Sequence, residues 1–136
     1  MSFTFNYRKE KIEEKTRYFP KAVITLFNKG IKFDYPALLD SGATDIFIPK
    51  QIAEALELDF KEENIASSWN GDFKVWNSHI GVILGKGSQT FRKVLPCLIP
   101  DSENPNQEVI LGRVLFNFFE VTFNEQKRTT KLKKIQ

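Results

Sequence analysis

Short apolar segments with the residue alternation of β-strands, separated by turn signals, run along most of the chain. The clearest turns are Asn28-Lys29-Gly30 and Asn70-Gly71, because asparagine and glycine readily adopt the backbone conformation of tight hairpins. Only residues 50–58, which follow Pro49, carry a helical apolar stripe, and residues 113–118 add one or two helical turns. The pattern predicts an all-β, mainly antiparallel domain with one short helix.

The 136 residues correspond to one domain preceded by a short N-terminal segment. We expect residues 1–19 to form a strand or arm, a candidate dimer contact, and residues 20–136 to form a single domain. The predicted strands cover residues 18–27, 31–39, 45–48, 75–84, 88–99, 109–111, 119–123 and 127–135, with a hairpin at 66–76 and a polar loop at 100–107.

Composition excludes several classes of protein. The single cysteine, Cys97, rules out a disulfide framework within the chain and indicates a reducing compartment, so we expect a cytoplasmic protein. Cys97 and the single histidine, His79, are too few for an ordinary structural zinc site, and we expect no metal and no cofactor. No apolar run is long enough to cross a bilayer and the N-terminus lacks a secretory signal, so no membrane partner is expected.

The most informative segment is residues 37–44, with the sequence Ala-Leu-Leu-Asp-Ser-Gly-Ala-Thr. Here an apolar strand runs directly into Asp40, and burying a carboxylate is costly unless another group pairs with it. Ser41 can hydrogen-bond locally, and Gly42 lets the backbone come close to another chain or a ligand. An Asp-Ser-Gly turn is also common at strand ends, so a structural turn and a functional site are both open on this segment alone.

Two further segments gain meaning from their positions after residues 37–44. Residues 109–113, Val-Ile-Leu-Gly-Arg, are an apolar triplet that ends at a glycine, which by itself is typical of a core strand. The turn Asn70-Gly71-Asp72 lies between the two segments and by itself is a surface turn.

In this order and spacing the three segments resemble the retropepsin-like aspartic proteases, a family of retroviral proteases and single-domain bacterial and archaeal relatives. The resemblance covers about residues 20 to 130. Residues 38–43 match the active-site loop of the family, residues 110–113 match its late apolar-apolar-Gly-Arg element, and the turn at Asn70-Gly71 falls where its flap belongs. The resemblance implies an acid-protease half with a closed barrel, a flap hairpin at about residues 66–76 and a homodimer.

The resemblance also implies a role for each matched residue. Asp40 is expected to be the catalytic aspartate, one from each of two chains, and the pair would share a proton and activate water against a peptide bond. Ser41 would brace the two active-site loops across the subunits, and Gly42 would offer its backbone to the peptide. The other members of the expected site are Ala43 in the loop, Ile110, Trp69, Asn70 and Gly71 for substrate binding, and Gly112, Arg113 and Asp45 as structural support.

One position departs from the pattern. Many retroviral members carry an acid at the position of Thr44 that pairs with the late arginine, and here the acid comes one place later, at Asp45. Asp45 is therefore only a candidate partner of Arg113, and the partner of this arginine stays open.

We expect an aspartic endopeptidase that acts on a peptide or protein substrate, and we keep two alternatives. The first is a dimer on the same fold that binds peptides but cleaves them weakly or not at all. The second is a basic β-barrel that binds nucleic acid, with Trp69, Phe73 and Trp76 as stacking platforms near the lysine-rich tail. The net charge of +3 is mild, so nucleic acid is not the expected partner.

Overall fold

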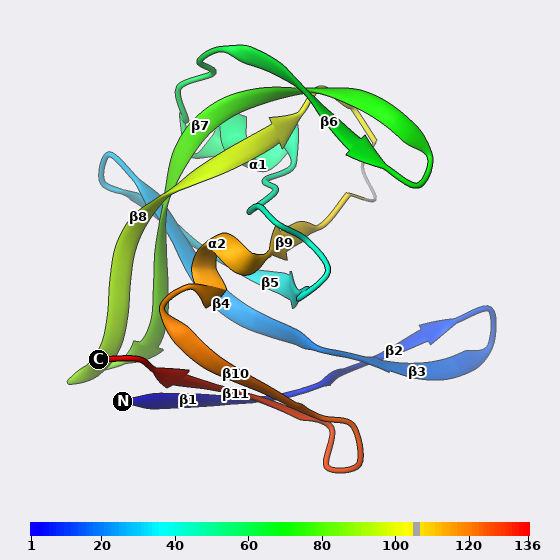
Figure 1. The fold of residues 1–136 in the computed structure, drawn as a ribbon, viewed down its shortest axis with the longest axis vertical. Coiled ribbons are helices and arrows are strands. Elements are labelled where there is room, and N and C mark those ends of the chain that lie inside the picture. Colours follow the sequence, from blue (N-terminus) through cyan, green and yellow to red (C-terminus); the bar gives the residue numbers. More distant parts are fainter. Residues whose placement is uncertain (105–106) are drawn as a thin grey trace.

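The structure, a computed structural model, describes residues 1–104 and 107–136. Within these ranges the chain forms eleven strands and two short helices, which confirms the all-β class (Figure 1). The strands are β1 (Ser2–Asn6), β2 (Arg8–Ile12), β3 (Lys15–Phe19), β4 (Lys21–Asn28), β5 (Ile31–Leu39), β6 (Glu63–Ser68), β7 (Gly71–Lys86), β8 (Gln89–Pro100), β9 (Val109–Leu111), β10 (Phe119–Asn124) and β11 (Thr129–Lys134). The helices are α1 (Lys50–Ala55) and α2 (Arg113–Phe116).

In the described part of the chain these strands form three sheets. The largest contains six strands in the order β6-β7-β4-β5-β9, and β8 pairs with β7 as well. A second sheet has the order β1-β11-β10, and β2 and β3 form a separate two-stranded ribbon. The pairing is antiparallel throughout except between β5 and β9, whose parallel alignment places Leu39 beside Leu111. The mainly antiparallel topology agrees with the sequence.

Both predicted hairpin turns are present. Asn28 and Ile31 pair across the turn between β4 and β5, and its central residues Lys29 and Gly30 have φ of 49° and 84°. These angles belong to a type I′ turn, whose twist matches that of the strands it joins. The second hairpin joins β6 and β7 and pairs Ser68 with Gly71.

Three strand predictions need correction. The predicted strands at 66–76 and 75–84 share β7, a continuous strand that pairs with β6 at its start and with β8 beyond it. Residues 45–48 are not a strand, since only Phe47 forms isolated bridges. The strand predicted at 18–27 is interrupted at Pro20, which has no N–H to donate to a ladder. The predicted loop at 100–107 is described only up to residue 104 and at 107.

The closed barrel predicted with the family resemblance is not found among the described strands. β8 and β9 do not pair with each other there, because the segment 46–48 lies between them. Leu98 of β8 bonds to Ile46 and Ile48, while Ile110 of β9 bonds to Phe47. This segment leads from the loop after β5 into α1, and it ties both neighbouring strands to that loop.

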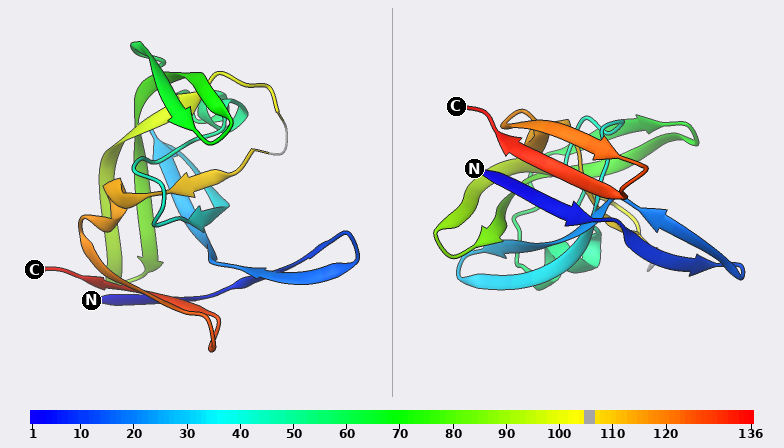
Figure 2. Two further views of the ribbon diagram at one scale, coloured as in Figure 1. Left: turned by 45° about the vertical axis from the view of Figure 1, so that its right-hand side comes forward. Right: turned by 90° about the horizontal axis from the view of Figure 1, so that it is seen from below.

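The first nineteen residues contribute two different elements (Figure 2). β1 completes the three-stranded sheet beside β11, and Phe3 of β1 is buried against Phe119. The β2–β3 ribbon instead extends away from the body of the molecule. No helix within the described residues is long and apolar enough to cross a membrane.

Apolar side chains from the largest sheet form one core that reaches both helices. Ala53 and Leu56, at and just after α1, are fully buried, as is Leu115 of α2. The core extends to Leu39 and Leu111, the last residues of β5 and β9. The two strands that precede the expected active-site residues are therefore fixed by burial.

Candidate active site

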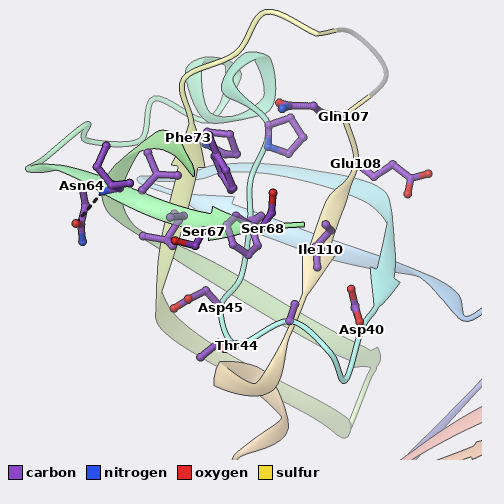
Figure 3. Close-up of a pocket in the computed structure, with 18 of the residues that line it drawn as sticks. Asp40, Thr44, Asp45, Asn64, Ser67, Ser68, Phe73, Gln107, Glu108 and Ile110 are labelled. Atoms are coloured by element: carbon purple, nitrogen blue, oxygen red, sulfur yellow. Dashed lines mark hydrogen bonds between the residues drawn. The ribbon is translucent and has the colours of Figure 1, made fainter. Parts of the chain in front are cut away.

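A groove of about 1530 Å³ separates the loop after β5 from the β6–β7 hairpin. Figure 3 shows Asp40 and Ile110 toward one end of this groove and Asn64 toward the other. The predicted site residues that line it are Asp40, Gly42, Ala43, Asp45, Trp69 and Ile110. The structure therefore brings together residues from three distant segments of the chain.

Asp40 is held by the backbone on both sides. Its N–H donates to the Leu111 carbonyl at 3.0 Å, which continues the β5–β9 pairing by one residue. Its Oδ1 accepts the Gly42 N–H at 2.9 Å, and its carbonyl accepts the Ala43 N–H at 3.2 Å. The carboxylate is thus half-buried, oriented by a backbone donor and open to the groove.

Gly112 lies against the loop that carries Asp40. A Cβ atom at this glycine would come within 2.5 Å of the Ala43 carbonyl oxygen and 2.3 Å of the Asp45 carbonyl oxygen. The following N–H groups of Arg113 and Val114 donate to the carbonyls of Ala43 and Thr44, at 2.9 Å and 3.0 Å. The start of α2 therefore binds the loop through its backbone.

The guanidinium of Arg113 donates from Nη2 to Thr44 Oγ1 at 3.0 Å. This bond answers the question that the sequence left open, because Thr44 occupies the position of the acid in many retroviral members. In the described part of the chain no ion pair joins Arg113 to Asp45, although Asp45 lines the groove close by.

The β6–β7 hairpin forms the opposite wall of the groove. Trp69, at its tip, is fully exposed and lines the groove, whereas Asn70 and Gly71 form the turn and do not line it. Ser68 Oγ accepts the Asn70 N–H and donates to the Gly71 carbonyl, both at 3.2 Å. The turn is thus shaped by its own hydrogen bonds, and none of the described residues covers the large apolar ring of Trp69 beside it.

Two aromatic residues that were not among the expected site residues also line the groove. Phe47 and Phe73 lie with their ring centroids 6.3 Å apart and connect the loop before α1 to the hairpin. Phe73 was visible in the sequence as an apolar residue of the hairpin. The place of Phe47 follows only from its bridges to β8 and β9.

Glu108, another groove residue missed in the sequence, lies immediately before β9 and forms an ion pair with Lys21. Asp40, Asp45 and Glu108 are the charged residues among the described groove lining, so the groove carries negative charge. Within the described residues no group of three or more metal-ligating side chains occurs.

The remaining chemical candidates lie outside the groove. Cys97 is buried, and burial raises the pKa of its thiol to about 12, so the thiolate that a nucleophile needs is not formed near neutral pH. His79 is exposed on β7, with its Nδ1 3.1 Å from Lys61 Nζ. Neither residue lines the groove that contains Asp40.

An acidic loop after a buried strand, with a glycine packed beneath it and a hairpin across a groove, is the arrangement that the sequence led us to expect of a retropepsin-like fold. The family model described as aspartyl protease matches residues 24–115, and the chain belongs to this family. It is therefore a peptidase, as the sequence predicted.

Solved structures agree with this fold. A retropepsin-like aspartic protease from Rickettsia conorii matches with a TM-score of 0.61 and 18% identity, over 97% of this chain and 90% of that one. The EIAV protease in complex with the inhibitor HBY-793 matches with a TM-score of 0.52 and 15% identity, over 73% of this chain and 86% of that one. The search of curated proteins found no significant match.

Proposed function

We propose that the chain is an aspartic endopeptidase that works as a homodimer, with Asp40 of each copy forming the catalytic pair. The observation that supports this most strongly is the setting of Asp40, which is oriented by the Gly42 N–H and opens on the groove. The Asp-Ser-Gly sequence occurs once in the chain, so one copy holds half of such a site. A second copy related by a two-fold axis close to Asp40 supplies the other half.

The chemistry follows from two carboxylates at short distance. Like charges repel, so the pair holds one proton between them. The ionised carboxylate takes a proton from a water molecule while the protonated one donates to the carbonyl oxygen of the peptide. The water oxygen attacks the carbonyl carbon to give a tetrahedral adduct. The carboxyl that took the proton of water then gives it to the amine nitrogen as the C–N bond breaks, and the other carboxylate recovers its proton from a hydroxyl of the adduct as the carbonyl re-forms.

Other residues act through position. Gly42, two residues after Asp40, lines the groove and presents its backbone to an extended peptide. Ile110 also lines the groove and supplies an apolar surface to the peptide. The Ser41 hydroxyl is exposed and makes no hydrogen bond within the described residues, so it is free to brace the loop of the second copy. Trp69 gives the hairpin an apolar tip, and closure of this flap over a peptide would bury the ring and exclude water.

The test is the substitution Asp40→Asn, measured as cleavage of a peptide with apolar residues at its centre from acidic to neutral pH. Asparagine has nearly the same shape, so the fold and the dimer should persist while cleavage is lost, because the amide cannot accept the proton of water. Asp59→Asn is the matched control, since Asp59 is exposed, pairs only with Lys29 among the described residues and lies outside the groove.

Sedimentation at tens of micromolar completes the test. A dimer of the parent and of Asp40→Asn, with cleavage only by the parent, supports the proposal. Cleavage by Asp40→Asn at the parental rate would show that Asp40 is a turn residue. A dimer of the parent that binds the peptide without cleaving it would instead favour a peptide-binding protein.

A further inference from the structure

The β2–β3 ribbon projects from the molecule and packs on it at its base, where the Arg128 guanidinium lies 3.5 Å from the centre of the Tyr18 ring and Lys21 pairs with Glu10. Its two strands pair only with each other, from Arg8 opposite Phe19 to Ile12 opposite Lys15, and none of its residues belongs to the apolar core. Figures 1 and 2 show it extending away from β1 and β4. An isolated two-stranded hairpin is at best marginally stable in water. Beyond its base, the ribbon would therefore gain stability by packing on another surface.

The turn of the ribbon forms its exposed tip. Its central residues, Glu13 and Glu14, have φ of 48° and 64°, a region that costs a residue with a side chain about 1 kcal/mol or more. Strain of this kind persists where the surroundings fix the conformation. Both residues are exposed, and the pairing of Ile12 with Lys15 across them closes the turn, as in a type I′ hairpin.

The base of the ribbon, in contrast, is anchored at the groove. Lys21 Nζ contacts both carboxylate oxygens of Glu10, at 3.0 Å and 2.8 Å, and pairs with Glu108 of the groove lining. The Lys21 side chain is only 8% exposed. Burial lowers the pKa of its ammonium, but the hydrogen bonds to Glu10 and Glu108 outweigh burial and raise that pKa. One ammonium thus fixes the direction of the ribbon relative to the active-site groove.

The anchored face of the ribbon continues outward to an apolar residue. Side chains alternate along a strand, so Ile12 lies on the same face as Glu10, and Ile12 is 44% exposed. In Figure 1 the ribbon, the β6–β7 turn and the end of β5 all extend toward the right-hand side of the molecule. A second copy that brings its Asp40 to the first must approach on that side, between the ribbon and the hairpin.

We propose that the β2–β3 ribbon is a dimer clasp, whose face with Glu10 and Ile12 packs on the second copy of this chain. This inference rests on the proposed function, because it takes the approach of the second copy from the pairing of the two Asp40 residues. The Glu10–Lys21–Glu108 cluster then links the clasp to the groove, so that the interface and the substrate-binding wall are held by the same ion pairs.

The test uses a spin label on Ile12→Cys in the full-length protein. Cys97 is buried and its thiol pKa is about 12, so the introduced cysteine is the one that reacts. The label should be immobile at concentrations where sedimentation shows a dimer, and mobile after dilution to the monomer. A label on Val94→Cys is the matched control, since Val94 is 58% exposed on β8, across the molecule from the ribbon, and should stay mobile in both states.

A second measurement reports affinity. Ile12→Asp should raise the dimer dissociation constant about tenfold or more, because it places a charge in an apolar contact, whereas Val94→Asp should leave that constant unchanged. A label at Ile12 that is equally mobile in dimer and monomer would overturn the clasp while leaving the proposed function intact. A protein that stays monomeric at every concentration would overturn both. Immobilisation only after nucleic acid is added would assign the ribbon to that partner instead.

Discussion

Gly112 lies so close beneath Ala43 that a Cβ atom on Gly112 would stand 2.5 Å from the Ala43 carbonyl oxygen. The neighbouring atoms are backbone and cannot rotate away as a side chain could. The loop that holds Asp40 therefore rests on β9 and α2 without a side chain between them. This contact makes the position of the carboxylate depend on a residue that is seventy-two positions later in the sequence.

Gly112→Ala should displace the active-site loop and lower activity more than stability. We expect a loss of the free energy of unfolding of about 1–3 kcal/mol, as for other overpacked sites, and a fall in kcat of more than about tenfold. Chemical denaturation and peptide cleavage measure the two quantities. Gly87→Ala is the control, because Gly87 has φ of 64° and a Cβ there would have no atom within 4 Å. This variant should lose stability through backbone strain but keep the cleavage activity of the parent.

The hydrogen bond between Arg113 and Thr44 predicts coupling between these two residues. Thr44→Val removes the acceptor, and each single substitution should cost less than about 1 kcal/mol because the bond is exposed. In a double-mutant cycle with Arg113→Gln, adding the second substitution should cause no further loss of the free energy of unfolding. Asp45→Asn should show no such coupling to Arg113. Coupling to Asp45 in place of Thr44 would reverse the assignment.

Hydrogen exchange should identify the β6–β7 hairpin as a mobile flap. Its β6 strand is an exposed edge and Trp69 is fully exposed, so the amides of residues 66–76 should exchange faster than those of β4 and β5. A bound peptide inhibitor should slow them, while the β10–β11 hairpin stays unchanged. Equal protection with and without inhibitor would mean that the hairpin does not close.

The buried thiol of Cys97 predicts a loss of stability at high pH. Burial raises its pKa from 9.0 to about 12, so between these values the unfolded chain releases a proton that the folded chain retains. The free energy of unfolding should therefore fall as pH rises through this window, by about 1 kcal/mol between about pH 8 and pH 10. The free energy of unfolding of Cys97→Ala should not show this fall. If the free energy of unfolding of the parent and of the variant changes with pH in the same way, the prediction is wrong.

The hairpins and the strand ends that border the groove were predictable because their signals are local. Asn28-Lys29-Gly30 and Asn70-Gly71 carry the turn chemistry that a hairpin needs, and each joins two strands in the structure. Residues 109–111 form a strand that ends at Gly112, as the apolar triplet indicated. The short strand predicted at 45–48 is different, because its apolar residues are equally suited to an irregular segment between two strands.

The sequence by itself determined the β class, the turns and the place of Asp40 directly after a strand, since these depend on residues that are neighbours along the chain. Tertiary structure decided the parallel pairing of β5 with β9, the bond of Arg113 to Thr44 and the ion pairs of Lys21. Those contacts join residues far apart in the sequence. The register in which two strands pair depends on how the whole sheet buries its apolar face. No local pattern around Asp40 contains that information.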